Sequence, residues 1–228
     1  MWCTTAWHEK LAVLKGAGQQ VCLQGLSMTE QMRCELITWS TVERLCLRLA
    51  GLISASGYRP DLIIAIGRGG YVPARLLCDY LGIMNLTSIK IEHYLAGADR
   101  QKQALVRYPL KADIRGMRVL VVDDVNDTGD TLAVARQHLQ AFQPAEIRIA
   151  VMCQKVTTSF IPDYYARKIL KWRWLIYPWA VHEDVAGFLG GPAEAPATQE
   201  QARAVLAEKF HIVISRQRLR DIYTSMGR

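Results

Sequence analysis

The residues of this 228-residue chain that could do chemistry are densest between Val119 and Leu132, which read VLVVDDVNDTGDTL. Asp123 and Asp124 follow a run of mostly β-branched apolar residues, which is typical of a central parallel strand buried on both faces. Open α/β sheets bind ligands at the carboxyl ends of their strands, so both carboxylates are expected at a ligand-binding edge. With Asp127, three carboxylates within five residues repel one another, which favours a magnesium-bound diol or pyrophosphate as their partner.

Residues 127–131 have the composition of a phosphate-binding loop. Gly129 allows a ligand to approach the backbone closely, and the neighbouring hydroxyl groups are available as donors. A helix that begins here binds phosphate through its free amides and the positive end of its dipole. The loop consists of Asp127, Thr128, Gly129, Asp130 and Thr131.

A second glycine-rich turn, Gly67-Arg68-Gly69-Gly70, follows a predicted strand over 61–66 and precedes a predicted helix that ends at Gly82. Arg68 can offer two parallel donors to an oxyanion, while Gly69 and Gly70 keep side chains away from it. A strand, a glycine-rich turn and a helix in this order form an anion-binding geometry, so two such sites are expected.

The elements that must position these loops alternate along the chain. Apolar spacing predicts a helix over 35–54, and further strands over 86–92, 119–122, 147–153 and 174–177. Alternating strands and helices predict an α/β fold with a doubly wound parallel sheet and right-handed crossovers.

Composition narrows the class of protein. The net charge of +7 is spread along the chain and suits an anionic small substrate as well as nucleic acid. No stretch reaches the roughly 18 consecutive apolar residues of a membrane helix, and the N-terminal segment lacks the pattern of a secretory signal. The six cysteines show no metal-ligand spacing, so we expect reduced thiols and a cytoplasmic protein.

The segment 119–132 resembles the phosphoribosyl diphosphate (PRPP) signature of type I phosphoribosyltransferases, and the 67–70 turn looks like the pyrophosphate loop of the 6-oxopurine branch. The resemblance implies the type I phosphoribosyltransferase fold, a doubly wound, mainly parallel sheet with a small hood, here with a helical C-terminal extension. It also implies a set of PRPP-binding residues: Arg68, Gly69, Gly70, Asp123, Asp124, Asp127, Thr128, Gly129, Asp130 and Thr131.

Roles follow from the same resemblance. Asp123 and Asp124 would bind Mg²⁺, directly or through ribose hydroxyls or water, and Arg68 would stabilise the departing pyrophosphate. Asp127 would be the general base or hydrogen-bond partner of the purine. The peptide bond before Arg68 can be cis in this family. A second metal contact is left open, with Glu183 or Asp184 as candidates.

The base site is also taken from the family. Lys155 matches a lysine that binds the exocyclic oxygen of the purine, and its ammonium donates to a keto group but cannot accept from an amino group. Trp174 would stack on the base and Leu175 would offer its backbone carbonyl. Residues 93–109 look like the flexible catalytic loop, in which Tyr94 matches the family's tyrosine and His93 stands where relatives often have serine.

The sequence divides into a poorly patterned leader (1–28), a phosphoribosyltransferase domain with its hood (29–189), a linker (190–198) and a two-helix extension (199–228). The predicted function is Mg²⁺-dependent transfer of the 5-phosphoribosyl group from PRPP to xanthine, guanine or hypoxanthine in purine salvage. We expect a homo-oligomer, a dimer or a tetramer, with no membrane partner and no nucleic acid.

Two alternatives stay open at this point. A PRPP-sensing regulator that binds nucleic acid could use the basic second helix of the extension, which carries Arg216, Arg218 and Arg220. An enzyme for another acceptor, orotate or adenine, is opposed by Lys155 and Trp174 through resemblance alone. The choice among the three 6-oxopurines is not fixed by the sequence, because they share the keto edge.

Overall fold

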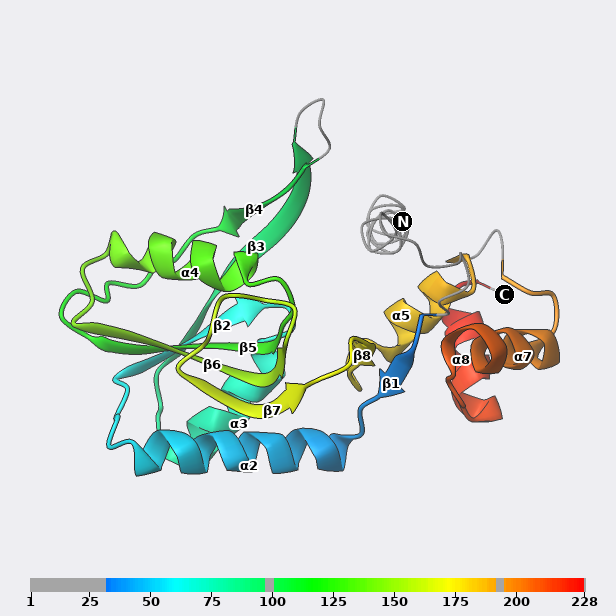
Figure 1. Cartoon of the computed structure of the whole chain (residues 1–228), viewed down its shortest axis with the longest axis horizontal. Coiled ribbons are helices and arrows are strands. Elements are labelled where there is room, and N and C mark those ends of the chain that lie inside the picture. Colours follow the sequence, from blue (N-terminus) through cyan, green and yellow to red (C-terminus); the bar gives the residue numbers. More distant parts are fainter. Residues whose placement is uncertain (1–31, 97–100, 192–194, 228) are drawn as a thin grey trace. The chain divides into compact units, whose positions relative to one another are not determined.

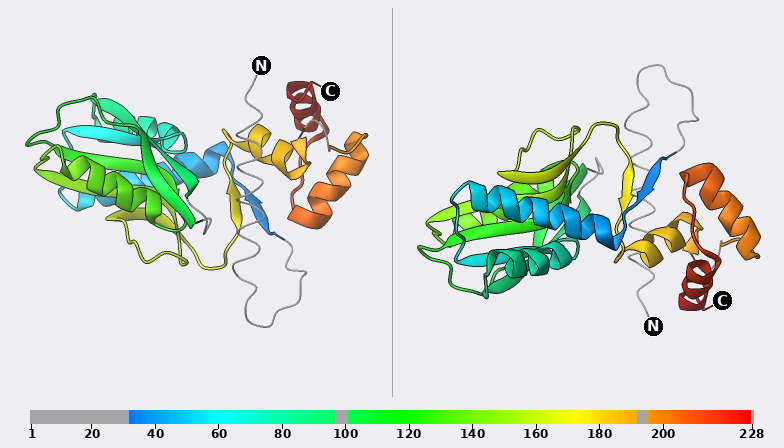
Figure 2. Two further views of the ribbon diagram at one scale, coloured as in Figure 1. Left: turned by 90° about the horizontal axis from the view of Figure 1, so that it is seen from above. Right: turned by 90° about the horizontal axis from the view of Figure 1, so that it is seen from below.

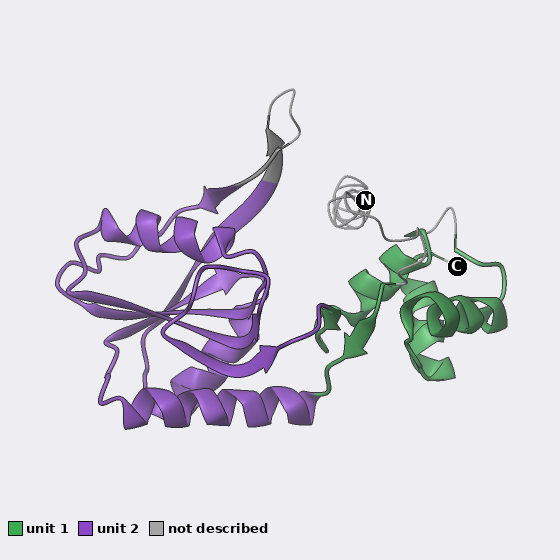
Figure 3. Ribbon diagram, viewed as in Figure 1, with its two compact units in different colours: residues 1–38, 173–228 green, residues 39–172 purple. Residues whose placement is uncertain are grey.

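The computed structural model describes residues 32–96, 101–191 and 195–227, and the chain divides into two units (Figure 3). Unit 2 is continuous and spans residues 39–172, whereas unit 1 joins residues 1–38 to residues 173–228. The predicted leader over 1–28 lies outside the described residues.

Unit 2 is built on a six-stranded sheet with the order β4-β3-β2-β5-β6-β7 (Figure 1). All neighbouring strands pair in parallel except β3 and β4, which are antiparallel. The strands are β2 (Leu62–Gly67), β3 (Leu86–Ala96), β4 (Gln101–Tyr108), β5 (Arg118–Asn126), β6 (Glu146–Lys155) and β7 (Tyr164–Ile169).

Helices cover both faces of this sheet, as the two views of Figure 2 show. The helices α2 (Trp39–Ala55) and α3 (Tyr71–Leu81) pack on one face, and α4 (Asp130–Gln140) packs on the other. Every residue of β2 is buried, as expected for a central strand between two helical layers. The predicted doubly wound, mainly parallel fold is confirmed.

Two predicted elements differ from the structure. The helix expected from residue 35 begins at Trp39, because residues 34–36 form a short strand instead. The long loop expected over 93–109 is largely an antiparallel hairpin, since β3 continues to Ala96 and β4 pairs with it residue by residue. The partner of residues 34–36 is β8, which lies far away in the sequence, so a local pattern cannot assign that strand.

Unit 1 has its own small core. Its strands β1 (Cys34–Leu36) and β8 (Trp174–Ile176) pair in parallel, and its helices are α5 (Val181–Phe188), α7 (Gln199–Phe210) and α8 (Arg216–Ser225). Buried residues of β8, α5, α7 and α8 form one cluster, so the C-terminal helices share a core with the predicted hood. The predicted domain boundaries at 189 and 198 fall inside this unit and stay a prediction.

The structure bears on two expectations from composition, the lack of a membrane-spanning helix and the reduced cysteines. Among the described helices, none is long and apolar enough to span a bilayer. The four described cysteines carry free thiols, which agrees with the expectation of reduced cysteines over that part of the chain; they are Cys34, Cys46, Cys78 and Cys153.

Gly70 lies where the turn after β2 passes closest to β5. A Cβ at this position would lie 2.3 Å from the carbonyl oxygen of Val122 and 2.8 Å from backbone atoms of Ile66. Backbone atoms in the middle of a sheet cannot shift to make room, so we expect Gly70→Ala to lower the free energy of unfolding by about 3 kcal/mol or more.

Urea unfolding followed by circular dichroism measures this effect, with Gly51→Ala as the matched control. A Cβ at Gly51 on α2 meets nothing within 4 Å, and alanine in a helix is favoured by roughly 0.5 to 1 kcal/mol over glycine. Equal midpoints for Gly70→Ala and the wild type would contradict the tight packing of the turn on β5.

Candidate active site

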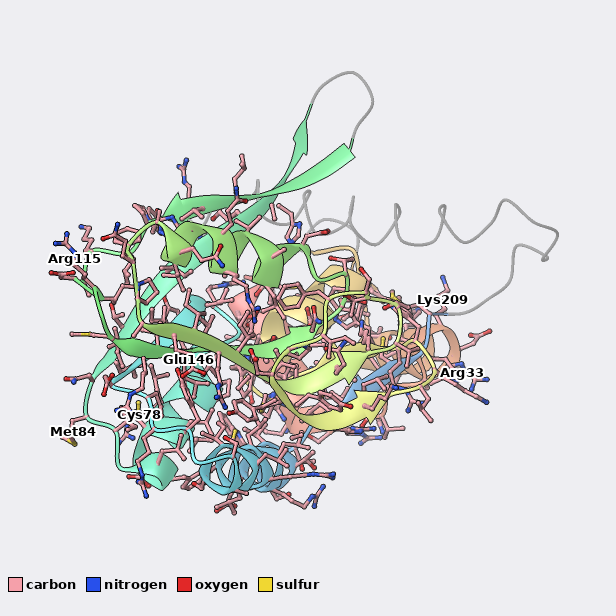
Figure 4. All side chains as sticks on the ribbon, turned by 60° about the vertical axis from the view of Figure 1, so that its left-hand side comes forward. Arg33, Cys78, Met84, Arg115, Glu146 and Lys209 are labelled. Carbon is pink, nitrogen blue, oxygen red and sulfur yellow. The ribbon has the colours of Figure 1, made fainter. Side chains whose placement is uncertain are left out.

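The predicted PRPP-binding residues and Lys155 lie at or just beyond the carboxyl ends of three adjacent strands of unit 2. The register pairs Ala65 of β2 with Val122 of β5, and Asn126 of β5 with Gln154 of β6, so the loops that follow these strands begin side by side. The amino ends lie at the opposite edge, near the labelled side chains of Met84 and Arg115 in Figure 4. Parallel pairing thus places the two anion-binding loops and Lys155 at one edge.

The glycine-rich turn after β2 packs directly against the paired carboxylates. A Cβ on Gly69 would lie 2.5 Å from a carboxylate oxygen of Asp124, so any larger residue there would displace that carboxylate. The peptide bond between Gly67 and Arg68 is cis, as the resemblance implied. Arg68 is exposed in the same turn, directly before Gly69, so the turn carries a cation.

Asp123 is the buried member of the carboxylate pair, with 8% of its surface exposed. Burial raises the pKa of Asp123 well above its ordinary value, and the neighbouring charge of Asp124 raises it further. The backbone N–H of Asp124 donates to Asp123 Oδ1 at 2.9 Å, which opposes this shift only in part. A bound cation would relieve the repulsion between the two carboxylates.

The loop before α4 has the geometry of an anion site. Gly129 has a φ of +96° and precedes α4 as an N-cap without a side chain, and the Asp130 N–H lies 3.4 Å from the Thr128 hydroxyl oxygen. The Thr128 hydroxyl donates to the Asp130 carboxylate at 2.9 Å. Because Asp130 is itself negative, it can serve a phosphate only through its backbone N–H.

Lys155 and Asp127 form an ion pair that sequence spacing did not predict. Lys155 Nζ lies 2.6 Å from Asp127 Oδ2, and the lysine is 3% exposed. The same ammonium lies 4.6 Å from the ring centroid of Trp172, a cation–π contact. The residue expected to recognise a base and the residue expected to accept its proton are therefore neighbours.

Three further residues contact the predicted site. Trp172 covers Lys155, His93 Nε2 lies 3.0 Å from the Thr131 hydroxyl, and Thr157 Oγ1 lies 3.0 Å from the Asp127 carbonyl oxygen. Their roles were not predicted, because each contact joins residues at least 17 positions apart in the sequence. Only the unusual histidine beside Tyr94 and the aromatic composition near Trp172 gave a signal.

Three predicted site residues lie away from the carboxyl ends of β2, β5 and β6. Tyr94 lies on β3 opposite Gln103, and Trp174 and Leu175 lie on β8 in unit 1. The ladder between β1 and β8 uses the Trp174 N–H and the Ile176 carbonyl, so the carbonyl of Leu175 between them points away from β1. The predicted base-binding roles of Trp174 and Leu175 stay predictions.

The open question of a second metal contact concerns unit 1 as well. Glu183 and Asp184 both lie in the first turn of α5, and Asp184 is buried. Burial, and to a smaller extent the nearby charge of Asp184, raises the pKa of Cys34 to about 12. Neither acidic residue belongs to the unit that holds Asp123, and their metal-binding role stays a prediction.

Residues 35–184 match the phosphoribosyl transferase domain. The chain belongs to this family. The matched region contains every predicted PRPP-binding residue, from Arg68 to Thr131, together with Lys155. Its relatives are named as phosphoribosyltransferases, so the prediction of an enzyme of the glycosyltransferase class is confirmed.

The curated relatives of this phosphoribosyltransferase include enzymes named for xanthine and guanine. Xanthine phosphoribosyltransferase 1 of Saccharomyces cerevisiae is 25% identical over 189 residues, which cover 65% of this chain and 90% of that protein. The xanthine-guanine phosphoribosyltransferase of Ruegeria sp. is 29% identical over 152 residues, which cover 63% of this chain and 83% of that protein.

Solved structures of similar fold extend this comparison. A purine phosphoribosyltransferase from Pyrococcus horikoshii superimposes with a TM-score of 0.57 at 35% identity, covering 64% of this chain and 93% of that one. A Neisseria gonorrhoeae protein with bound ppGpp gives a TM-score of 0.58 at 27% identity, covering 66% of this chain and 91% of that one.

Proposed function

We propose that this phosphoribosyltransferase transfers the 5-phosphoribosyl group of PRPP to a 6-oxopurine, giving a nucleoside monophosphate and pyrophosphate. The observation that carries the proposal is the Lys155–Asp127 pair, 2.6 Å apart, directly before the phosphate loop. The Lys155 ammonium can donate to a keto oxygen, and the neighbouring Asp127 carboxylate can accept from a ring N–H. A 6-oxopurine presents those two groups, its 6-keto oxygen and its N7–H, side by side along one edge.

The bond from the anomeric carbon to pyrophosphate breaks first in this mechanism, and its electron pair leaves with the pyrophosphate. Arg68 stabilises the departing charge, and the amides at the start of α4 hold the 5-phosphate. A purine nitrogen then donates its lone pair to the anomeric carbon from the opposite face. The proton displaced from the imidazole ring goes to Asp127, whose carboxylate acts as the general base.

Lys155 gives the site its preference among bases. An ammonium has three donors and no acceptor, so it can keep its bond to Asp127 while it donates to a keto oxygen. Adenine presents an amino group at the same position, which leaves that donor without a partner and costs binding free energy. Trp174 is proposed to stack on the base and Leu175 to accept a hydrogen bond from it.

Magnesium fits the donor set at this edge. Among the described residues, no three His, Cys, Asp or Glu side chains cluster to hold a metal by themselves. Mg²⁺ keeps several waters and is usually held by one or two carboxylates together with substrate oxygens, which Asp123 and Asp124 can provide. When bound, Mg²⁺ would neutralise charge on the pyrophosphate.

The names of the relatives support the proposed purine specificity. The names of similar enzymes include xanthine, guanine and hypoxanthine, and one similar structure binds the guanine nucleotide ppGpp. We therefore propose a role in purine salvage in the cytoplasm, carried out by a homo-oligomer, either a dimer or a tetramer.

Replacement of Lys155 by methionine tests the proposed base specificity. We expect Lys155→Met to lower kcat/KM for hypoxanthine, guanine and xanthine by about 10- to 100-fold, the value of a hydrogen bond to a charged group. Lys168→Met, which removes an exposed lysine from β7, is the matched control and is expected to keep wild-type rates.

The assay follows absorbance with PRPP and Mg²⁺ and offers each 6-oxopurine, adenine and orotate separately. Turnover of at least one 6-oxopurine by the wild type, lost in Lys155→Met, supports the proposal. Bound PRPP with no turnover of any base would instead favour the PRPP-sensing regulator, and filter binding to DNA and RNA across a salt series would then measure its nucleic-acid affinity.

A further inference from the structure

Two buried amide side chains lie side by side beneath the proposed site. Asn126 is 2% exposed at the end of β5, and Gln154 is 6% exposed at the neighbouring position of β6. The Asn126 side chain donates from Nδ2 to Gln154 Oε1 at 2.8 Å. Buried amides are costly unless they are paired, so this contact fixes the relative positions of the two strand ends.

Both amides also hold the loop that follows β6. Asn126 Nδ2 donates to the carbonyl oxygen of Phe160 at 2.8 Å, and Gln154 Nε2 lies 3.4 Å from the same oxygen. Gln154 Nε2 donates in addition to the carbonyl oxygen of Lys155 at 3.1 Å. One amide pair therefore anchors residues 156–160 at both ends.

The anchored loop packs against the proposed catalytic loop at two points. A Cβ on Gly129 would lie 2.5 Å from Thr158 Oγ1 and 2.6 Å from Phe160 Cβ, so the loop occupies the space beside the glycine. The Thr157 hydroxyl lies 3.0 Å from the Asp127 carbonyl oxygen and 3.4 Å from Asp127 Oδ1. Thr157 thus approaches one carboxylate oxygen of Asp127, and Lys155 holds the other.

We propose that Thr157 is a positioning residue for Asp127, and that the Asn126–Gln154 pair sets the position of Thr157. The inference rests on the proposed function, in which the Asp127 carboxylate accepts a proton from the purine. Lys155 holds the carboxylate through Oδ2, and the Thr157 hydroxyl donates its single proton to the nearer Asp127 carbonyl oxygen at 3.0 Å, so the two contacts fix the side chain and the backbone of Asp127. A proton acceptor held in this way needs less reorganisation when the base arrives.

The positioning role predicts a change in kcat with little change in substrate affinity. Thr157→Val keeps the shape of the side chain and removes its hydroxyl, and we expect kcat to fall by roughly 3- to 10-fold, the value of one neutral hydrogen bond. The KM for PRPP should stay within about twofold, because the phosphate and diol contacts are made by other residues. Thr157→Ser restores the hydroxyl and should recover most of the wild-type kcat.

A second pair of variants tests the anchor. Asn126→Leu combined with Gln154→Leu removes both side-chain amides together, so neither amide is left without the other, and it withdraws their donors from the carbonyl oxygens of Phe160 and Lys155. We expect this double variant to lower kcat at least as much as Thr157→Val does. Adding Thr157→Val to it should change kcat by less than about twofold, because residues that act through one contact are not additive.

The experiment measures kcat, the KM for PRPP, PRPP affinity by calorimetry and the melting temperature of each full-length variant. Ser159→Ala, on an exposed residue of the same loop, is the control. If the wild type is active and Thr157→Val keeps the wild-type kcat, the positioning role is overturned and the proposed function stands. The same conclusion follows if Thr157→Val lowers kcat and Thr157→Ser does not recover it. A wild type that binds PRPP without turning over any base overturns the proposed function and this inference with it.

Discussion

Asp127→Asn is expected to lower turnover of the preferred 6-oxopurine by about 10²- to 10⁴-fold, the usual contribution of a general base. The amide keeps the size of the carboxylate, and its single carbonyl oxygen can still accept from Lys155, whose Nζ lies 2.6 Å from Asp127 Oδ2, while its NH₂ group takes the place of Oδ1. It cannot take up the proton that the purine loses. PRPP affinity is expected to stay within about threefold, because the phosphate contacts use other groups.

Single-turnover kinetics and calorimetry with PRPP separate these two effects. Asp113→Asn is the matched control, because Asp113 is an exposed carboxylate outside the site whose hydrogen bond to the Arg115 N–H an asparagine can keep. A melting temperature for each variant shows whether Lys155 tolerates the loss of its counter-charge. Wild-type turnover by Asp127→Asn would remove the role assigned to this carboxylate.

Asp123→Asn is expected to stabilise the protein while it lowers activity. The pKa of Asp123 is raised well above its ordinary value of 3.8 by burial first and by Asp124 second. Between that ordinary value and the raised folded value, the folded protein binds more protons than the unfolded chain. Stability contributed by this group is therefore present below about pH 3.8 and declines as the pH rises through the raised pKa.

An asparagine at position 123 does not ionise and escapes that decline. We expect the variant to gain about 0.5 to 2 kcal/mol in unfolding free energy at pH 7, and to lose this advantage near pH 4. Turnover should fall at least about tenfold, because the site loses one of its two adjacent carboxylates. This trade of stability for function is common at active sites.

Urea unfolding at both pH values, with a chelator present, measures the difference for Asp123→Asn. Asp79→Asn, on an exposed carboxylate of α3, controls for the general effect of removing one negative charge. A gain that is equal at pH 4 and pH 7 would contradict the assignment to the buried carboxyl.

The sequence predicted those parts of the site that depend on neighbouring residues. The buried strand before Asp123, the glycine-rich turn after β2 and the helix that follows Gly129 are each specified within about a dozen residues, so periodicity and turn chemistry identify them. The alternation of strands and helices then indicates a doubly wound, mainly parallel sheet. For this reason the fold and the family could both be predicted.

Contacts between distant residues could not be predicted in the same way. The Lys155–Asp127 pair joins two strand ends, and the contact between His93 and Thr131 joins β3 to α4. The β3–β4 hairpin was expected to be a loop, because its polar residues give no clear alternation and its strands gain stability mainly from pairing. Long-range pairing depends on register, which a single sequence does not specify.

The division of unit 1 between the two ends of the chain has a consequence for synthesis on the ribosome. The strand β1 begins at residue 34, and its partner β8 begins at residue 174, 140 positions later. At about 5 to 20 residues per second, β1 waits on the order of ten seconds for its partner to be translated. All of unit 2 is made in that interval, so the sheet that carries the proposed active site can fold before unit 1 is complete.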